Sequence, residues 1–289
     1  MKFSLVMPTV ERTIEPQRFF QSLRDQTFTD FELIVVDQNR DQRLLELVDR
    51  FRGSFSITHL RPTAIGASHA RNVGLRVASG NVTTFPDDDC WYADRTLLER
   101  AAAILTARQR LAAVTGRALD EHGRPCQLRW PTRPGRLNCF NLWRMAVEFT
   151  MFMRRELFHA VGEFDEHLGP PWSAGEGSDL LIRALSAGFR IDYEPGLVVQ
   201  HPNPIVVHDE RVRRRAYRYS VGFGRTLRKN GYPIATVAYH CARPAGAALL
   251  ALLLGRQRQA KYYWAATRGK IRGFARPGPD ATPNCTSLL

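Results

Sequence analysis

Short apolar runs alternate with amphipathic segments over the first two thirds of the chain. Nearly continuous apolar runs predict strands at 3–7, 31–37, 56–61, 81–85 and 111–119, with shorter ones at 191–193 and 197–200. Apolar residues spaced by three or four predict helices at 15–24, 42–52, 66–78, 96–109, 151–161 and 180–187. This alternation predicts an α/β fold, a mixed, mostly parallel sheet flanked by helices.

Polar side chains follow three of the predicted strands at the point where each strand ends. Thr9 follows the first strand, Asp37 ends the second, and the triplet Asp87-Asp88-Asp89 follows the run that ends at Phe85. In open α/β sheets, ligands bind beyond the carboxyl ends of the strands. We therefore expect these polar groups to share one crevice.

The carboxylates of Asp87, Asp88 and Asp89 repel one another unless a cation lies among them. Hard oxygen ligands suit Mg²⁺ or Mn²⁺, and such ions usually bridge to substrate phosphates. The triplet therefore indicates a metal site for a diphosphate. A solvated acidic turn that leads into a helix is the alternative.

Composition is ordinary for a soluble globular protein, since 44% of the 289 residues are hydrophobic and 24% are charged. The net charge of +13 is unevenly placed, because residues 209–289 hold 16 Lys and Arg and only three acids. Within 210–230, one helical stripe is apolar: Val212, Ala216, Tyr219, Phe223 and Leu227. A basic amphipathic tail of this kind predicts association with an anionic membrane surface. A helical bundle that packs on the main domain and has a solvated basic face is the alternative.

Five scattered cysteines without a CxxC pair favour neither a zinc site nor a disulfide framework, and a reducing compartment fits them. Because Met1 leads almost directly into the first predicted strand, we expect no signal peptide. The longest apolar run, 245–254, is shorter than the roughly 20 residues that cross a bilayer, so we expect no transmembrane helix.

Five motifs, in this order and spacing, resemble the family 2 glycosyltransferases of the GT-A fold. They are Met7-Pro-Thr-Val-Glu11, 32–37, 66–74, the Asp triplet and 175–190. The resemblance covers about residues 3–201. It implies a GT-A (Rossmann-like) domain at 1–208, with a nucleotide-sugar half at about 1–120 and an acceptor half at about 121–208. Residues 209–289 then form the basic, membrane-associating tail.

The resemblance also implies roles for single residues. The residues expected to bind the nucleotide sugar are Pro8, Thr9, Glu11, Asp37, Arg71, Asp87 and Asp88. The expected metal ligands are Asp89, as the principal one, with Asp87 and His201. Each has a plainer alternative: a turn for Thr9, a helix cap for Asp37, a surface ion pair for Arg71 and a structural role for His201.

Inverting transfer needs a base to remove the proton of the acceptor hydroxyl. The family usually supplies it from a Glu-Asp-x-Asp-Leu segment, with the second residue as base. In this chain, Gly177 stands at that second position, between Glu176 and Asp179. We expect Glu176 to be the base, in a mobile loop between two glycines. Asp179 is the second candidate, although its place before an apolar helical run favours a cap.

Together these features predict an inverting, metal-dependent glycosyltransferase. The expected donor is a nucleoside-diphosphate sugar, and the acceptor is a saccharide or a lipid-linked acceptor in cell-surface polysaccharide biosynthesis. The expected location is cytoplasmic, peripheral on the inner face of the membrane.

Two other functions are alternatives. A nucleotidyltransferase that makes a nucleotide sugar would show a Gly-rich basic loop after the first strand, and residues 8–12 are not one. A nucleic-acid-binding protein could use the basic tail. We expect no nucleic acid, because the charge is confined to an amphipathic tail.

Overall fold

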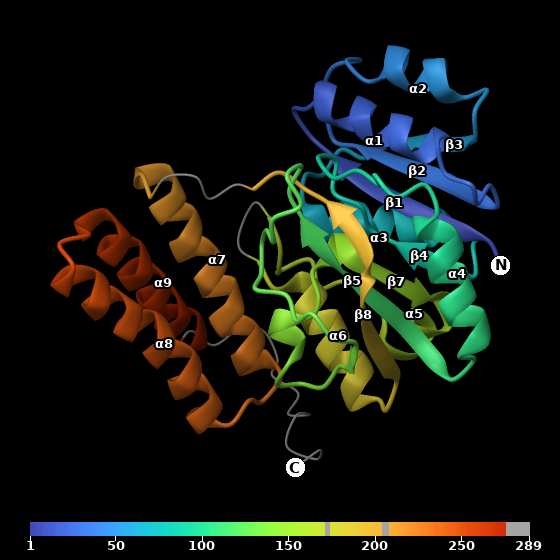
Figure 1. Cartoon of the computed structure of the whole chain (residues 1–289). Helices are drawn as coiled ribbons and strands as arrows, with labels where there is room; N and C mark the ends of the chain where they lie inside the picture. The colour runs from blue at the N-terminus through green and yellow to red at the C-terminus, as the bar shows by residue number, and fades with distance from the viewer. Residues whose placement is uncertain (171–173, 204–207, 276–289) are drawn as a thin grey trace. The chain divides into compact units, whose positions relative to one another are not determined.

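The computed structural model describes residues 1–170, 174–203 and 208–275 (Figure 1). The chain divides into two compact units. Unit 1 comprises Met1–Phe164 and Ala187–Asn203, and unit 2 comprises Asp165–Ser186 and Pro204–Leu289. This division differs from the predicted one at residues 165–186, which belong with the C-terminal helices and not with the rest of the predicted acceptor half.

Unit 1 is built on an eight-stranded sheet of order β3-β2-β1-β4-β7-β5-β8-β6. Its strands are β1 Phe3–Thr9, β2 Phe31–Asp37, β3 Ser56–Leu60, β4 Val82–Thr84, β5 Leu111–Leu119, β6 Gly135–Arg136, β7 Met151–Arg154 and β8 Arg190–Gln200. The pairs β1–β2, β1–β4, β2–β3 and β5–β8 are parallel, whereas β7 is antiparallel to β4 and β5, and β6 is antiparallel to β8. The predicted mixed, mostly parallel sheet is therefore confirmed.

The helices of unit 1 flank this sheet (Figure 1). They are α1 Ile14–Arg24, α2 Leu45–Phe51, α3 Ala67–Val77, α4 Leu97–Ala107 and α5 Arg155–Val161, with short 3₁₀ turns at Leu142–Arg144 and Glu148–Thr150. Gly74 shows why α3 lies close to the sheet: a Cβ at this position would overlap the side chain of Val6 in β1. The absence of a side chain thus lets the helix pack directly on the strands whose ends carry Thr9 and Asp37.

Two predicted elements of unit 1 were wrong. Residues 151–161 are not one helix, because Met151–Arg154 forms β7 between β4 and β5 and only Arg155–Val161 is helical. A run as short as Met-Phe-Met fits a buried strand or a buried helix equally well. It forms a strand because it pairs with β4 on one side and β5 on the other. The two short strands predicted at 191–193 and 197–200 are a single strand, β8, which pairs with β5 across a shift in register.

The regular elements that the structure describes in unit 2 are all helices. Its helices are α6 Glu176–Ser186, α7 Glu210–Lys229, α8 Ile234–Leu253 and α9 Gln257–Ala275. A Cβ on Gly269 of α9 would meet the backbone of Tyr217 in α7, and one on Gly273, four residues later, would meet the backbone of Val221, also four residues later. Successive residues of α7 therefore face successive residues of α9, and glycines let the two helices run side by side in the same direction.

The described part of the tail, residues 208–275, is therefore a helical bundle. The apolar stripe of α7 is partly used inside it, since Leu227 is buried and the Phe223 ring lies edge-on to His240 of α8, with ring centroids 5.0 Å apart. Over the ranges 1–170, 174–203 and 208–275, no helix has both the length and the apolar character needed to cross a membrane. Cys90, Cys126, Cys139 and Cys241 are free thiols, and Cys285 lies outside the described residues.

Candidate active site

The ends of four strands of unit 1 bring the polar residues together. Thr9 and Asp37 lie opposite each other in the parallel pairing of β1 with β2, and β4 ends at Thr84, just before the Asp triplet. The end of β8 joins them through Trp91, which exchanges two backbone hydrogen bonds with Gln200, at N···O distances of 3.0 and 2.9 Å. This exchange places the residue after Gln200 beside the triplet.

That residue is His201, and it forms a cluster with Asp87 and Asp89. One ligand atom from each residue lies within 4.8 Å of the other two. His201 Nε2 is 3.1 Å from Asp89 Oδ1 and 3.9 Å from Asp87 Oδ2. Its Nδ1 donates to the Pro202 carbonyl at 2.6 Å, so Nε2 is the nitrogen turned toward the carboxylates. The fold thus gathers the three residues expected as metal ligands.

This donor set fits a divalent cation. Two carboxylates and one imidazole converge, and a hydrogen bond to the second ring nitrogen fixes the orientation of the imidazole. Phe149 stacks on the His201 ring at a centroid distance of 4.7 Å, which holds the ring in place. Carboxylate oxygens suit Mg²⁺ and Mn²⁺ alike, whereas the imidazole nitrogen favours Mn²⁺ of the two.

Two arginines offset the charge of the triplet. Arg71, which is 4% exposed, lies with Nη2 3.1 Å from Asp87 Oδ1. Nη1 of Arg12 lies 2.5 Å from Asp88 Oδ1 and 2.7 Å from Asp89 Oδ2. Because one guanidinium faces each side of the triplet, the site combines carboxylates for a metal with cations suited to phosphate.

Asp88 differs from its two neighbours in its contacts. It accepts a hydrogen bond from the Thr9 hydroxyl at 2.8 Å and another from Arg12, and it is not part of the cluster with His201. Thr9 is therefore more than a turn residue, because its hydroxyl links the end of β1 to the triplet.

The three carboxyl groups differ in their affinity for protons. Burial raises the pKa of Asp88 to about 6, against the opposing effects of Arg12 and the Thr9 hydrogen bond. Burial likewise raises the pKa of Asp87, although the charge of Arg71 opposes it. Burial also acts on Asp89, but hydrogen bonds and charges from His201 and Arg12 outweigh it and lower the pKa. Asp89 is thus the carboxyl of the triplet that stays most firmly ionised, which suits the role of principal metal ligand that the resemblance implies.

Asp37 ends β2 and is almost completely buried. Its Oδ1 accepts hydrogen bonds from the backbone and side chain of Asn39 at 2.9 and 2.7 Å, and its Oδ2 lies 3.0 Å from His59 Nε2. The next helix, α2, begins only at Leu45, so Asp37 is not its cap. The polar contacts of Asp37 instead tie the ends of β2 and β3 together.

Pro8 and Glu11 lie on either side of the end of β1. Pro8 is within the strand and half-buried, whereas Glu11 follows the strand and is exposed. Glu11 has a φ of 64°, which is uncommon for a residue with a side chain, and its backbone N–H donates to Asn39 Oδ1 at 2.6 Å. That hydrogen bond fixes the backbone turn that carries Arg12 toward the triplet.

The two candidate bases belong to unit 2 and occupy α6. Glu176 is not in a loop, because it is the first residue of the helix, and it is 4% exposed. Asp179 is not a cap either, since its backbone N–H bonds to the Gly175 carbonyl inside the helix. Its fully buried carboxylate accepts hydrogen bonds from Arg183, Lys229 and Asn230 at 3.0, 2.9 and 2.9 Å. These contacts give Asp179 a structural role in unit 2.

Sequence reasoning overlooked Arg12 and His59. Arg12 could have been noticed as a basic residue three positions after Thr9, close to a predicted acidic site. His59 lies in β3, where it pairs in register with Val35 of β2, and only the sheet brings it to Asp37. No local signal marks it.

Comparisons with known proteins agree with this architecture. The model of the family described as Glycosyl transferase family 2 matches residues 4–162. The chain is 28% identical over 138 residues to "Poly(ribitol-phosphate) beta-N-acetylglucosaminyltransferase TarS" of Staphylococcus aureus. This match covers 46% of this chain and 24% of that protein. It is 29% identical over 173 residues to a "PGL/p-HBAD biosynthesis glycosyltransferase" of Mycobacterium bovis, covering 56% and 63% of the two chains. The chain thus spans less than two thirds of each of these relatives.

Solved structures share the fold. The mannosyltransferase PcManGT of Pyrobaculum calidifontis, solved with GDP-Man and Mn²⁺, superposes with a TM-score of 0.65 at 18% identity, over 93% of this chain and 87% of that one. Residues 1–349 of Staphylococcus aureus TarS, solved with UDP-GlcNAc, superpose with a TM-score of 0.60 at 16% identity, over 94% and 91%.

Proposed function

The chain belongs to glycosyl transferase family 2, and from this premise we propose that it transfers a sugar from a nucleoside-diphosphate sugar to a saccharide or a lipid-linked acceptor. The observation that carries the proposal is the cluster of Asp87, Asp89 and His201, with Arg12 and Arg71 beside it. Two relatives of the fold, solved with UDP-GlcNAc and with GDP-Man and Mn²⁺, support a nucleotide sugar as donor. The family match favours glycosyl transfer over nucleotidyl transfer.

In this proposal Asp89, Asp87 and His201 hold Mn²⁺ or Mg²⁺. The bound ion supplies Lewis-acid stabilisation of the negative charge on the departing nucleoside diphosphate. Arg71 contributes a guanidinium suited to the diphosphate. Thr9 keeps Asp88 in place and Asp88 contacts the ribose, while Pro8, Glu11 and Asp37 shape the nucleotide site at the ends of β1 and β2.

We assign the inverting step to a carboxylate of α6. Inversion requires that the acceptor oxygen attack the anomeric carbon from the face opposite the leaving group, while a base takes the proton of the acceptor hydroxyl. Glu176 is the proposed base. Asp179 is the second candidate, and its three hydrogen bonds within unit 2 count against it.

A screen of nucleotide sugars tests the proposed reaction. Purified full-length chain is incubated with each donor and Mn²⁺ or Mg²⁺, and release of nucleoside diphosphate is measured with and without EDTA. We expect turnover with a restricted set of donors, loss of turnover in EDTA, and recovery when excess Mn²⁺ is added. Equal rates with and without EDTA would contradict the metal-dependent reaction.

We further propose that the protein acts in cell-surface polysaccharide synthesis, at the cytoplasmic face of the membrane and attached peripherally through unit 2. The end of α8 supports this, because it exposes five leucines within six residues: Leu249, Leu250, Leu252, Leu253 and Leu254 are each 56–77% exposed. Exposed Arg256 and Arg258 follow directly. Leucines beside cations suit the boundary between acyl chains and anionic headgroups.

Sedimentation with vesicles checks this attachment. The full-length chain should pellet with phosphatidylglycerol-containing vesicles at low salt and keep a salt-resistant fraction, because screening weakens only the electrostatic part. Replacing Leu249 and Leu253 by Ser should remove that fraction, since each buried leucine is worth about 1.5–3 kcal/mol. Ile234→Ser, an equally exposed apolar site at the opposite end of α8, is the matched control and should change little. A chain that stays in the supernatant at low salt would refute the attachment.

A further inference from the structure

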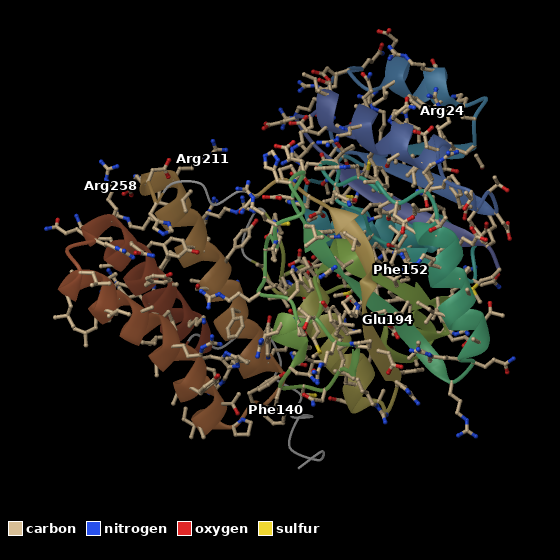
Figure 2. All side chains as sticks on the ribbon, in the orientation of Figure 1. Arg24, Phe140, Phe152, Glu194, Arg211 and Arg258 are labelled. Atoms are coloured by element: carbon tan, nitrogen blue, oxygen red, sulfur yellow. The ribbon has the colours of Figure 1, made fainter. Side chains whose placement is uncertain are left out.

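A groove with a volume of about 980 Å³ lies in unit 2 between the first halves of α7 and α9. Its lining is strongly cationic. Six of the side chains that line it are basic: Arg211, Arg213, Arg214, Arg218, Lys261 and Arg268. Figure 2 shows Arg211 and Arg258 at the same end of this unit, where α7 and α9 begin. Nothing in the proposed sugar transfer uses these cations.

The acidic residues near the groove do not balance this charge. Glu210 forms ion pairs with Arg213 and Arg214, and the Asp209 side chain caps α7 by accepting from the backbone N–H of Val212 at 2.8 Å. Residues 208–275 contain no other acid. Four lining cations have no ion pair with an acid among the residues that the structure describes: Arg211, Arg218, Lys261 and Arg268.

The geometry of the helix pair sets two of these cations across from each other. Gly269 packs against the backbone of Tyr217, so Arg268 of α9 and Arg218 of α7 line the groove at the same level. Trp264, one turn earlier in α9, also lines the groove and is 54% exposed. Two arginines from different helices with an exposed indole beside them can contact one ligand from several sides. A basic surface spread over a single helix cannot do so.

We propose that this groove binds a phosphate-bearing ligand with at least two negative charges, such as a diphosphate. Arginine guanidinium groups match phosphate oxygens in paired hydrogen bonds, so Arg218 and Arg268 hold the phosphates from both walls. Lys261 and Arg211 add long-range attraction, and Trp264 packs on the part of the ligand next to the phosphates. Either a lipid-linked acceptor or an anionic lipid headgroup could present this chemistry. The site itself does not depend on the proposed transfer reaction.

Binding of inorganic pyrophosphate to the full-length chain tests the site. Titration in EDTA prevents a metal from bridging pyrophosphate to the Asp triplet, and isothermal calorimetry gives the affinity. Arg218→Gln with Arg268→Gln should weaken binding at least tenfold, because both phosphate contacts are lost. The matched control is Arg225→Gln with Arg228→Gln, which removes the same charge from α7 outside the groove and should weaken binding less than twofold. A change in tryptophan fluorescence on binding, absent in Trp264→Phe, locates the ligand.

Equal losses in the two double variants would overturn the proposal, because attraction would then follow net charge and not the groove. An unchanged fluorescence signal in Trp264→Phe would overturn it as well. If single-stranded RNA binds more tightly than pyrophosphate and its binding depends equally on Arg218 and Arg268, the ligand of the groove is a nucleic acid and the proposal is wrong. Metal-dependent release of nucleoside diphosphate should be unaffected by the groove variants, so a failure of this inference is separable from a failure of the proposed reaction.

Competition distinguishes the two sources of phosphate. If the groove takes lipid headgroups, vesicles containing cardiolipin, whose headgroup carries two phosphates, should displace pyrophosphate, whereas vesicles of phosphatidylcholine alone should not. If it takes the diphosphate of an acceptor, pyrophosphate should remain bound to the vesicle-attached protein. Either result supports a phosphate site and identifies its ligand.

Discussion

Replacing Asp89 by Ala should abolish metal-dependent turnover and reduce Mn²⁺ binding by at least two orders of magnitude. The expectation follows from three observations. Asp89 lies 3.1 Å from His201 Nε2, its carboxyl is the one of the triplet whose pKa is lowered, and it is one of three ligand atoms within 4.8 Å. Loss of a charged ligand removes much of the attraction for a divalent ion. Even the loss of a residue that only hydrogen-bonds to a metal ligand typically lowers metal affinity 10–100-fold.

Paramagnetic resonance of free Mn²⁺ measures the binding directly and does not depend on activity. Asp25→Ala, which removes a half-exposed carboxylate from the end of α1, is the control and should leave both metal binding and turnover unchanged. The thermal midpoint of Asp89→Ala should fall by a few degrees at most, because the change also relieves repulsion from Asp87 and Asp88. Wild-type Mn²⁺ affinity in folded Asp89→Ala would show that the metal lies elsewhere.

Glu176→Gln should lower the rate of transfer by about 10²-fold or more while donor affinity barely changes. The substitution keeps the shape of the side chain and removes its basicity, and general-base contributions are typically of this size. Single-turnover transfer to acceptor, with donor binding measured separately, separates the chemical step from binding. Glu156→Gln, an exposed position in α5, is the matched control and should leave both unchanged.

Asp179→Asn should act on stability first. The buried carboxylate accepts hydrogen bonds from Arg183 and Lys229, and loss of its charge breaks both ion pairs at a fully buried position, although Lys229 keeps its ion pair with Asp165. We expect about 2–4 kcal/mol less stability, read from denaturant unfolding, with residual transfer in the folded fraction. If Asp179→Asn instead lowers transfer 10²-fold with unchanged stability, and Glu176→Gln does not, the base is Asp179 and our assignment is wrong.

Local patterns alone were enough to predict most of unit 1. The predicted strands 31–37 and 111–119 coincide with β2 and β5, because a strand buried on both faces needs a continuous apolar run and ends where polarity returns. The same reasoning placed Thr9, Asp37 and the triplet at strand ends. Parallel strands carry their carboxyl ends to one edge, so the meeting of these residues followed from the pattern.

Other features depended on contacts that no local pattern encodes. His201 reaches Asp89 because the end of β8, at Gln200, pairs with Trp91, which lies more than a hundred residues earlier in the sequence. Met151–Arg154 is a strand because β4 and β5 lie on either side of it, although its composition also fits a helix. Arg12 was overlooked because a single basic residue in a loop is common in any sequence. Only its short distance to the triplet in the structure identifies it as part of the site.

The sequence by itself determined the α/β class, the acidic strand ends and the concentration of positive charge after residue 208, because each depends on the order of residue types along the chain. Only the tertiary structure decided that Glu176 and Asp179 begin a helix, that three ligand atoms converge on one point, and that the basic tail is a bundle with a groove between α7 and α9. These properties arise from packing between distant segments. Glycines such as Gly74 and Gly273 allow close packing at these contacts. The spacing of apolar residues predicts that a helix forms, but it does not predict which segment the helix packs against.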